Sequence, residues 1–366
     1  MADILKDFKS PEISSILTKE FSKYQDRTFK IMELCGTHTM SIFKSGVRDL
    51  LPKNVKLISG PGCPVCVTPN YYMDNAVKLS MMKDVIVTTF GDLMRVPGDG
   101  KSLLEAKTEG ADARVVYSPI DSLKIATENP DKKVVFLSVG FETTTPVVAL
   151  AVKKAKEQGI NNFYILAGNK TMPAAVEALS MDKEITIDGF LYPGHVSSVA
   201  GTEYARVNSK KYGIPGVIAG FEPVDLLYAI LELVKLIVEG KGEVKNLYKR
   251  VVREEGNPAA FSTMLEVFEP CDTVWRGLGN IPMSGLELRK PYEAYDAWKV
   301  FNLEQNIDEK ITGCICGDIL KGIKEPPDCP LFAKKCTPNR PVGACMVSSE
   351  GTCAAHYKYG RYKINV

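Results

Sequence analysis

The chain has 366 residues and a nearly balanced charge, with 46 Lys and Arg residues against 44 Asp and Glu residues and a net charge of +2. This balance argues against a nucleic-acid-binding tail, and no apolar run is long enough to cross a bilayer. Because the first residues lack the apolar core of a signal peptide, we expect a cytoplasmic protein with no nucleic-acid or membrane partner. In that compartment the ten cysteines indicate metal ligands or redox thiols rather than structural disulfides.

The first predicted element is a helix that opens at Pro11, with Ser10 as its N-cap. Apolar, β-branched runs then alternate with helical stretches, and they are continuous rather than alternating, as in strands that are buried on both faces. The predicted strands cover residues 29–34, 55–59, 84–90, 113–118, 133–139, 162–168, 189–194 and 216–220. Strands that alternate with helices indicate a parallel α/β sheet.

The strands fall into two groups along the chain, at about 28–118 and 133–219, and a long helix that closes at Gly240 follows them. From about residue 245 the pattern becomes irregular and rich in Pro, Gly and Cys. We therefore predict two parallel-sheet α/β domains, residues 1–130 and 131–243, that flank a cleft. A third, cysteine-rich domain is expected over residues 244–366.

Four predicted strands end in similar loops, "SGPGCPVCVTP", "SVGFETTTP", "LAGNKTMP" and "IAGFEP". Each loop passes from glycine through polar or thiol residues to proline and a helix. Glycine allows the backbone to turn sharply, and proline suits a first helical turn. Because ligands bind at the carboxyl ends of parallel strands, four such loops favour a cleft over simple turns.

Six cysteines lie close together near the end of the chain: Cys314, Cys316, Cys329, Cys336, Cys345 and Cys353. Soft thiolates in a loop-rich segment suit zinc or an iron–sulfur cluster. Structural zinc sites prefer paired ligands with two to four residues between them, and the segment has no C-x-x-C pair. The spacing therefore favours a four-iron cluster.

A second group of candidates follows the first two strands. Cys35 and His38 are three residues apart, as are Cys63 and Cys66. The "CPVC" pair just ahead of a predicted helix indicates a reversible dithiol, while Cys35 could bind a metal and His38 could tune it. Zinc would equally accept these three thiols and one imidazole, and spacing alone does not separate the two interpretations.

Three further polar residues lie in the glycine- and proline-rich loops: Glu142, His195 and Glu222. Carboxylates could accept protons or bind a partner, but acidic residues also favour helix N-termini. We expect capping for Glu222 and a functional role for His195. The segment "VPGDGKS" is not a P-loop, because position 95 is arginine where that motif needs glycine.

Taken together, the blocks "CGTHT", "GPGCPVCV", "GFETTTP", "PGHVS", "GFEP" and "CTPNRPVGACMVSSEGTCAA" resemble the HypD family of hydrogenase maturation proteins. The match runs in order from about residue 30 to the end, with Cys271 and Cys314 as extra cysteines. The resemblance implies a cytoplasmic scaffold on which the Fe(CN)₂CO group of [NiFe]-hydrogenase is assembled. It also implies a small HypC-type chaperone as partner and a HypE-type cyanide donor, with HypF upstream.

The resemblance further implies site roles. Cys35 would bind the iron of the Fe(CN)₂CO group, and Cys63 and Cys66 would form the redox dithiol. Beside these roles, the residue types themselves lead us to expect catalytic roles for His38, Glu142 and His195, with His38 orienting ligands or moving protons near Cys35. A [4Fe–4S] cluster would be held by Cys316, Cys329, Cys336 and Cys353, with Cys345 as the substitute ligand.

Two other hypotheses stay open on the motifs alone. One is a zinc-dependent enzyme that uses Cys35, His38, Cys63 and Cys66. The other is a thiol–disulfide oxidoreductase that acts on other proteins.

Overall fold

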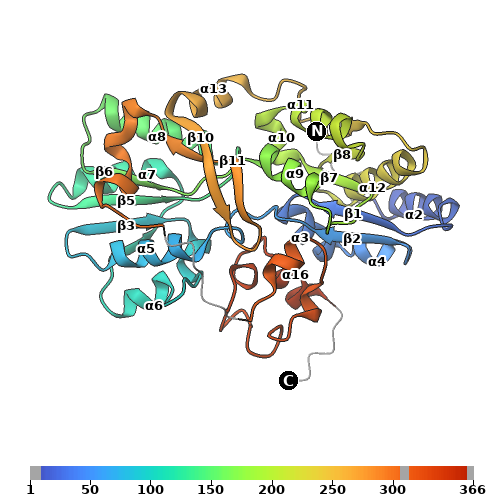
Figure 1. The fold of residues 1–366 in the computed structure, drawn as a ribbon, viewed down its shortest axis with the longest axis horizontal. Coiled ribbons are helices and arrows are strands. Elements are labelled where there is room, and N and C mark those ends of the chain that lie inside the picture. The colour runs from blue at the N-terminus through green and yellow to red at the C-terminus, as the bar shows by residue number, and fades with distance from the viewer. Residues whose placement is uncertain (1–9, 306–312, 361–366) are drawn as a thin grey trace.

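The computed structural model describes residues 10–305 and 313–360. Two parallel sheets form its frame (Figure 1). The first sheet has the order β2-β1-β7-β8-β9 and the second the order β4-β3-β5-β6. The strands of the first sheet are β1 (Phe29–Glu33), β2 (Val55–Ser59), β7 (Gly189–Pro193), β8 (Gly216–Ala219) and β9 (Val244–Asn246). Those of the second are β3 (Val85–Thr89), β4 (Ala113–Val115), β5 (Lys133–Ser138) and β6 (Phe163–Ala167). All eight predicted strands are confirmed.

The helices connect the parallel strands, as the sequence pattern predicts, except that the first helix precedes β1 and the last one follows β9. In the first half of the chain they are α2 (Pro11–Glu20), α3 (Gly36–Ser45), α4 (Val47–Leu50), α5 (Asn70–Ser80), α6 (Leu103–Thr108) and α7 (Pro119–Glu128). Those that follow are α8 (Thr145–Glu157), α9 (Met172–Met181), α10 (Gly194–Ala200), α11 (Glu203–Tyr212), α12 (Pro223–Val238) and α13 (Pro258–Val267). The predicted Ser10 cap is confirmed, because its hydroxyl accepts the Ile13 N–H at 3.3 Å.

The predicted grouping of strands is wrong. β1 pairs with β7 through Met32 and Phe190, so the first sheet combines the start of the chain with residues 189–246. The second sheet takes the strands between, and the expected boundary at residue 130 does not separate the two sheets. Buried parallel strands are apolar on both faces, so their side-chain pattern carries no information about which strand lies beside them.

The region after residue 245 contains an antiparallel hairpin that the sequence analysis missed. It consists of β10 (Phe268–Trp275) and β11 (Gly279–Leu288), with a register shift between Cys271 and Thr273. Figure 1 shows the hairpin crossing between the two sheets. The chain continues through η3 (Lys290–Tyr295), α14 (Ala297–Val300), α15 (Cys316–Leu320), η4 (Pro326–Asp328), η5 (Ala344–Met346) and α16 (Thr352–Tyr359).

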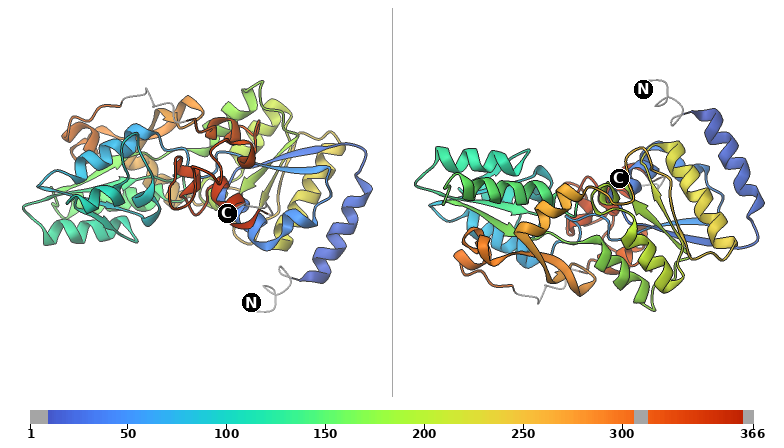
Figure 2. Two further views of the ribbon diagram at one scale, coloured as in Figure 1. Left: turned by 90° about the horizontal axis from the view of Figure 1, so that it is seen from below. Right: turned by 90° about the horizontal axis from the view of Figure 1, so that it is seen from above.

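The cysteine-rich segment lies between the two sheet lobes in both views of Figure 2. One apolar core reaches from the first sheet to this segment and includes Tyr192, Cys63, Cys66 and Cys345. Phe141, from the loop after β5, belongs to the same core. The loops at the carboxyl ends of both sheets therefore converge at the centre of the molecule. None of the described helices is long and apolar enough to cross a membrane.

Candidate functional site

The Cys35 loop and the dithiol loop pack backbone against backbone. Cys35 follows β1 and Gly62 follows β2, the neighbouring parallel strand. The Gly36 N–H donates to the Gly62 carbonyl at 3.1 Å. A Cβ atom on Gly62 would lie 2.3 Å from the Cys35 nitrogen, so only glycine allows this approach. The backbones of the Cys35 loop and the dithiol loop are therefore in direct contact.

The two dithiol residues are joined as a disulfide. The Cα atoms of Cys63 and Cys66 are 5.3 Å apart, and both side chains are buried. The Cys66 N–H points at the Cys63 sulfur at 3.2 Å, and the hydroxyl of Ser348 lies 3.3 Å from the same sulfur. α5 begins at Asn70, with Pro69 at the cap position. The disulfide is thus shielded from solvent. Its polar contacts are the hydrogen bonds at the Cys63 sulfur.

Cys35 occupies the N-cap position of α3 and is buried. Burial, with the charge of Glu350 adding to it, raises the pKa of the Cys35 thiol to about 11. The N–H groups of His38 and Thr37 oppose this rise. Without a bound cation the thiol therefore stays protonated at neutral pH, and a metal that binds there must displace its proton.

The His38 and His195 rings both contact the Phe221 ring, His38 in a tilted arrangement and His195 in a stacked one. The His38 ring is buried and lies 4.6 Å from the Phe221 ring, while the exposed His195 ring lies 3.8 Å from it. His38 Nε2 is 3.0 Å from the Gly220 carbonyl, so this nitrogen carries the proton and Nδ1 is an acceptor. Nδ1 has no hydrogen-bond partner among the described residues. Burial lowers the pKa of His38 to about 4, and the imidazole is neutral.

The zinc interpretation requires Cys35, His38, Cys63 and Cys66 to converge on one ion. In the described part of the chain no three His, Cys, Asp or Glu side chains form a group that could hold a single metal ion. His38 instead binds a carbonyl, and two of the three thiols are bonded to each other. The geometry therefore does not support the zinc set.

Glu142 has the capping role that the sequence analysis gave to Glu222. Its Oε1 accepts the N–H of Met172, the first residue of α9, at 2.9 Å. Burial raises the pKa of Glu142 to about 7, and Oε2 has no hydrogen-bond partner in the described residues. Glu222 sits at the N-cap of α12, but its side chain makes no capping hydrogen bond there. The capping expectation for Glu222 is wrong in that respect.

The six C-terminal cysteines surround one cavity, which we call the cysteine cavity. It is lined by Cys314, Cys316, Cys329, Cys336, Cys345 and Cys353, with apolar side chains between them. The Val342 N–H donates to the Cys336 sulfur at 3.3 Å. Among the described residues no three of these thiols are placed to hold a single metal ion, and ligands that line a cavity can instead bind the separate iron atoms of a cluster. Soft donors in an apolar shell fit an iron–sulfur cluster, and six are present where four are needed.

A buried cation lies between the dithiol loop and the cysteine cavity. Arg276 is 5% exposed, its N–H donates to the Val67 carbonyl at 2.8 Å, and its guanidinium donates to Asn70. Its Nε has no hydrogen-bond partner among the described residues. Its charge opposes the rise in the pKa of both Cys314 and Cys345, whose main causes are the Cys316 side chain and burial, respectively. Arg276 therefore favours thiolates in the cavity.

Residues 345–353 connect the cysteine cavity to the Cys35 and dithiol loops. Cavity thiols stand at both ends of this segment, and Ser348 reaches the Cys63 sulfur from its middle. Glu350 accepts a hydrogen bond from the Thr37 hydroxyl at 2.5 Å. Sequence analysis did not single out Ser348, Glu350 or Arg276, because each acts through a contact with a distant part of the chain.

Comparison with known proteins gives the family. The model of the family described as "HypD: Hydrogenase formation hypA family" matches residues 12–360. The chain belongs to the HypD family. It is 48% identical over 343 residues to hydrogenase maturation factor HypD of Cupriavidus necator, covering 92% of this chain and 90% of that protein. The chain is 45% identical over 339 residues to hydrogenase maturation factor HypD of Escherichia coli, covering 91% of this chain and 90% of that protein. It is 44% identical over 372 residues to hydrogenase maturation factor HypD of Rhizobium leguminosarum, covering 99% of this chain and 97% of that protein. HypD membership gives the chain a role in hydrogenase maturation, as its motifs predict.

Proposed function

We propose that the chain is the scaffold on which the Fe(CN)₂CO group of [NiFe]-hydrogenase is assembled, in complex with a HypC-type chaperone. The observation that carries the proposal is the close packing of the segments that carry three sulfur sites: Cys35, the Cys63–Cys66 pair and the cysteine cavity. One core includes both dithiol residues and Cys345, and Gly62 lies against the Cys35 backbone. A single thiol beside a redox pair suits the binding of a metal group that is built stepwise.

Cys35 would supply one thiolate to the iron of the cargo, and the chaperone would supply another. Cyanide would come from a HypE-type donor, which HypF serves upstream. Carbonyl and cyanide ligands favour a low-spin iron(II), for which thiolates are suitable anchors. The N–H groups of Thr37 and His38 at the start of α3 reach the Cys35 sulfur, so they would stabilise its charge once its proton is lost.

The cysteine cavity would hold a [4Fe–4S] cluster, with Cys316, Cys329, Cys336 and Cys353 as ligands and Cys345 as the substitute. When bound, such a cluster supplies electrons one at a time. Oxidation of the reduced Cys63–Cys66 pair to its disulfide releases two electrons and two protons. Ser348 hydrogen-bonds the Cys63 sulfur, so it would orient the pair in both states.

Neutral His38 would act as a proton acceptor near the cargo, because its Nδ1 lone pair is free of hydrogen bonds within the described residues. His195 would support it from the exposed side of Phe221. Glu142 would hold the start of α9 in place while its pKa of about 7 allows it to gain or lose a proton near neutral pH.

The oxidoreductase alternative is less well supported. A thiol that exchanges with protein substrates needs an accessible sulfur. Cys63 is 4% exposed and Cys66 is 1% exposed, so another protein could not reach the disulfide without a rearrangement.

The proposal is tested by isolating the chain without air, together with a HypC-type chaperone. Infrared bands of cyanide and carbonyl on iron, with iron in excess of four atoms per chain and matching sulfide, would support it. Stoichiometric zinc without these bands would overturn it.

A further inference from the structure

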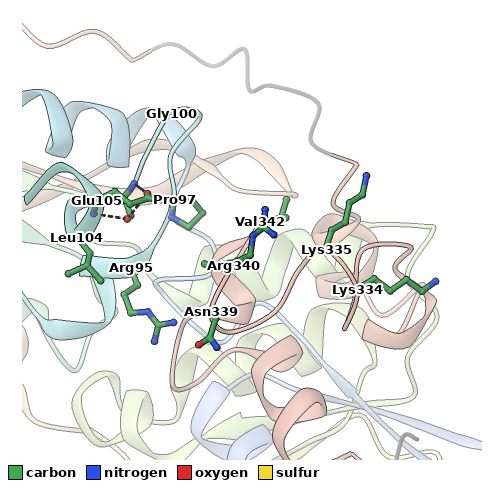
Figure 3. Close-up of a pocket in the computed structure, with 12 residues that line it drawn as sticks. Arg95, Pro97, Gly100, Leu104, Glu105, Lys334, Lys335, Asn339, Arg340 and Val342 are labelled. Carbon is green, nitrogen blue, oxygen red and sulfur yellow. Dashed lines mark hydrogen bonds between the residues drawn. The ribbon is translucent and has the colours of Figure 1, made fainter. Parts of the chain in front are cut away.

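A second hollow lies on the surface beside the cysteine cavity, and we call it the basic hollow. Its volume is about 690 Å³. It is lined by Arg95, Pro97, Gly100, Ser102, Leu104, Glu105, Lys334, Lys335, Asn339, Arg340, Pro341 and Val342. The lining comes from two distant segments, 95–105 beside the second sheet and 334–342 in the cysteine-rich region. Figure 3 shows that Arg95 and Arg340 come from these two segments.

The charge of the hollow is strongly one-sided. Four cations line it, Arg95, Lys334, Lys335 and Arg340, and all are exposed. The one acidic residue, Glu105, is engaged by the N–H of Ser102 at 2.7 Å and by its hydroxyl at 2.8 Å. Over residues 10–305 and 313–360, none of the four cations forms an ion pair. A chain with a net charge of only +2 has concentrated unpaired positive charge at this place.

The wall of the hollow is held in position. The Arg95 guanidinium, at the end of η2 (Gly91–Arg95), donates to the Pro338 carbonyl and ties the two segments together. Thr337 and Arg340 exchange backbone hydrogen bonds at 3.2 and 3.0 Å, so a tight turn presents Arg340. Figure 3 shows Lys334 and Lys335 extending outward from the same loop.

The loop that carries the cations also carries a cavity thiol. Lys335 precedes Cys336, whose sulfur lines the cysteine cavity and accepts the Val342 N–H. The Cys336 N–H in turn donates to the Leu331 carbonyl at 2.8 Å. One face of this loop therefore belongs to the cysteine cavity and the other to the basic hollow. A partner bound in the hollow would be separated from the cavity by a single loop.

We propose that the basic hollow is the docking surface of an acidic one-electron carrier protein that reduces the centre in the cysteine cavity. The inference rests on the proposed function, because it needs a cluster behind the Cys336 loop. In each encounter the reduced carrier gives up one electron and the centre gains it, and no bond is made or broken. Opposite charges on the two surfaces would speed the encounter and orient the carrier toward the loop.

A phosphate-bearing small molecule fits the hollow less well. Phosphate sites in loops are built from free backbone N–H groups. In the glycine-rich stretch of the hollow, the N–H groups of Asp99 and Gly100 already donate to the Asp74 carboxylate at 3.0 and 3.4 Å. That carboxylate would also repel a phosphate. Exposed cations on a rigid rim suit a large acidic surface better.

The test variant replaces Lys334, Lys335 and Arg340 by Glu and keeps Arg95, which holds the wall. The probe is an acidic [2Fe–2S] ferredoxin, mixed in its reduced form with the anaerobically purified chain in a stopped-flow instrument. At low ionic strength we expect the second-order rate of centre reduction to fall at least tenfold. The difference should shrink steadily with added salt, because salt screens the attraction. Binding of the oxidised ferredoxin, followed by calorimetry, should weaken in parallel.

A matched control carries the same change in net charge elsewhere, with Lys53, Lys83 and Lys249 replaced by Glu. These residues are exposed and lie outside the basic hollow. We expect this control to lose less than threefold in rate. Reduced methyl viologen, a small cation, should reduce the centre in all three proteins without a loss of rate, which shows that the centre is intact.

Three results would overturn the inference. The first is an unchanged ferredoxin rate in the Lys334, Lys335 and Arg340 variant. The second is an equal loss in the control. The third is saturable binding of inorganic triphosphate in the hollow without any binding of ferredoxin. A chain that carries no iron and sulfide at all would instead refute the proposed function, so the two failures are distinguishable.

Discussion

The contact between the dithiol loop and the Cys35 loop can be tested by one methyl group at Gly62. An ideal Cβ there would lie 2.3 Å from the Cys35 nitrogen and 2.4 Å from the Leu34 carbonyl carbon. Ordinary contact begins at 3.4 Å, so the two loops would have to separate by about 3.4 − 2.3 = 1.1 Å. Both neighbours are backbone atoms, which cannot rotate away as a side chain could.

Overpacking of this kind costs about 1–3 kcal/mol. We therefore expect Gly62→Ala to lower the free energy of unfolding by about that amount in urea titrations. The hydrogen bond from Gly36 N–H to the Gly62 carbonyl would be strained as well. Because the dithiol would move away from Cys35, the infrared bands of the iron cargo should also weaken or disappear.

Gly100→Ala is the matched control. A Cβ on Gly100 would have no neighbour within 4 Å, and we expect its stability to stay within about 0.5 kcal/mol of the original chain. If Gly62→Ala and Gly100→Ala gave the same unfolding curves and the same infrared bands, the close packing of the two loops would be needed neither for stability nor for binding of the iron cargo.

Four other substitutions probe three separate parts of the site. Glu142→Gln should remove a pH dependence of the free energy of unfolding. The pKa of Glu142 in the folded chain, about 7, lies above the ordinary value of 4.5, so the neutral carboxyl is the form that the fold favours. As pH rises from 4.5 through 7, the original chain should lose up to about 3 kcal/mol of unfolding free energy relative to the variant, measured by urea unfolding at each pH. A flat difference would show that Glu142 is not held in its neutral form. Arg276→Met should lower the reduction potential of the centre in the cysteine cavity, because a nearby positive charge favours the reduced form of that centre. A redox titration followed by EPR measures the potential, and iron and sulfide counts show that the centre is present. An unchanged potential would contradict this role of Arg276. Cys345→Ala should keep four iron atoms per chain while Cys329→Ala loses them, and the reverse result would exchange their roles.

Much of the fold could be predicted from the sequence because its signals are local. Apolar β-branched runs mark strands, and the glycine and proline in each following loop mark where helices begin. The pairing of the strands could not be predicted. β1 pairs with β7 across about 150 intervening residues, and neither apolar run contains a signal that identifies its partner strand. The β10–β11 hairpin was missed because its strands carry Gly, Pro, Asp and Glu among the apolar residues.

For the candidate site, residue type indicated chemistry but not geometry. The cysteines were found because thiols are rare and their clustering is visible along the chain. Arg276, Ser348 and Glu350 are common residue types, and their importance arises only where distant segments meet. Glu142 and Glu222 both follow Gly-Phe in similar loops, yet Glu142 caps the first turn of α9, while the Glu222 side chain makes no capping hydrogen bond at α12. Capping by a neighbouring helix start leaves no mark in the local sequence.

The account depends most on Cys35 as the anchor of the iron cargo. Cys271 offers a matched control, because burial raises the pKa of its thiol to about 11 as well, but it lies on the β10–β11 hairpin. Infrared spectra of complexes isolated without air should show iron-bound cyanide and carbonyl for the original chain and for Cys271→Ala. For Cys35→Ala we predict that these bands are absent while the iron and sulfide of the cysteine cavity remain. Bands of full intensity in Cys35→Ala would contradict the account.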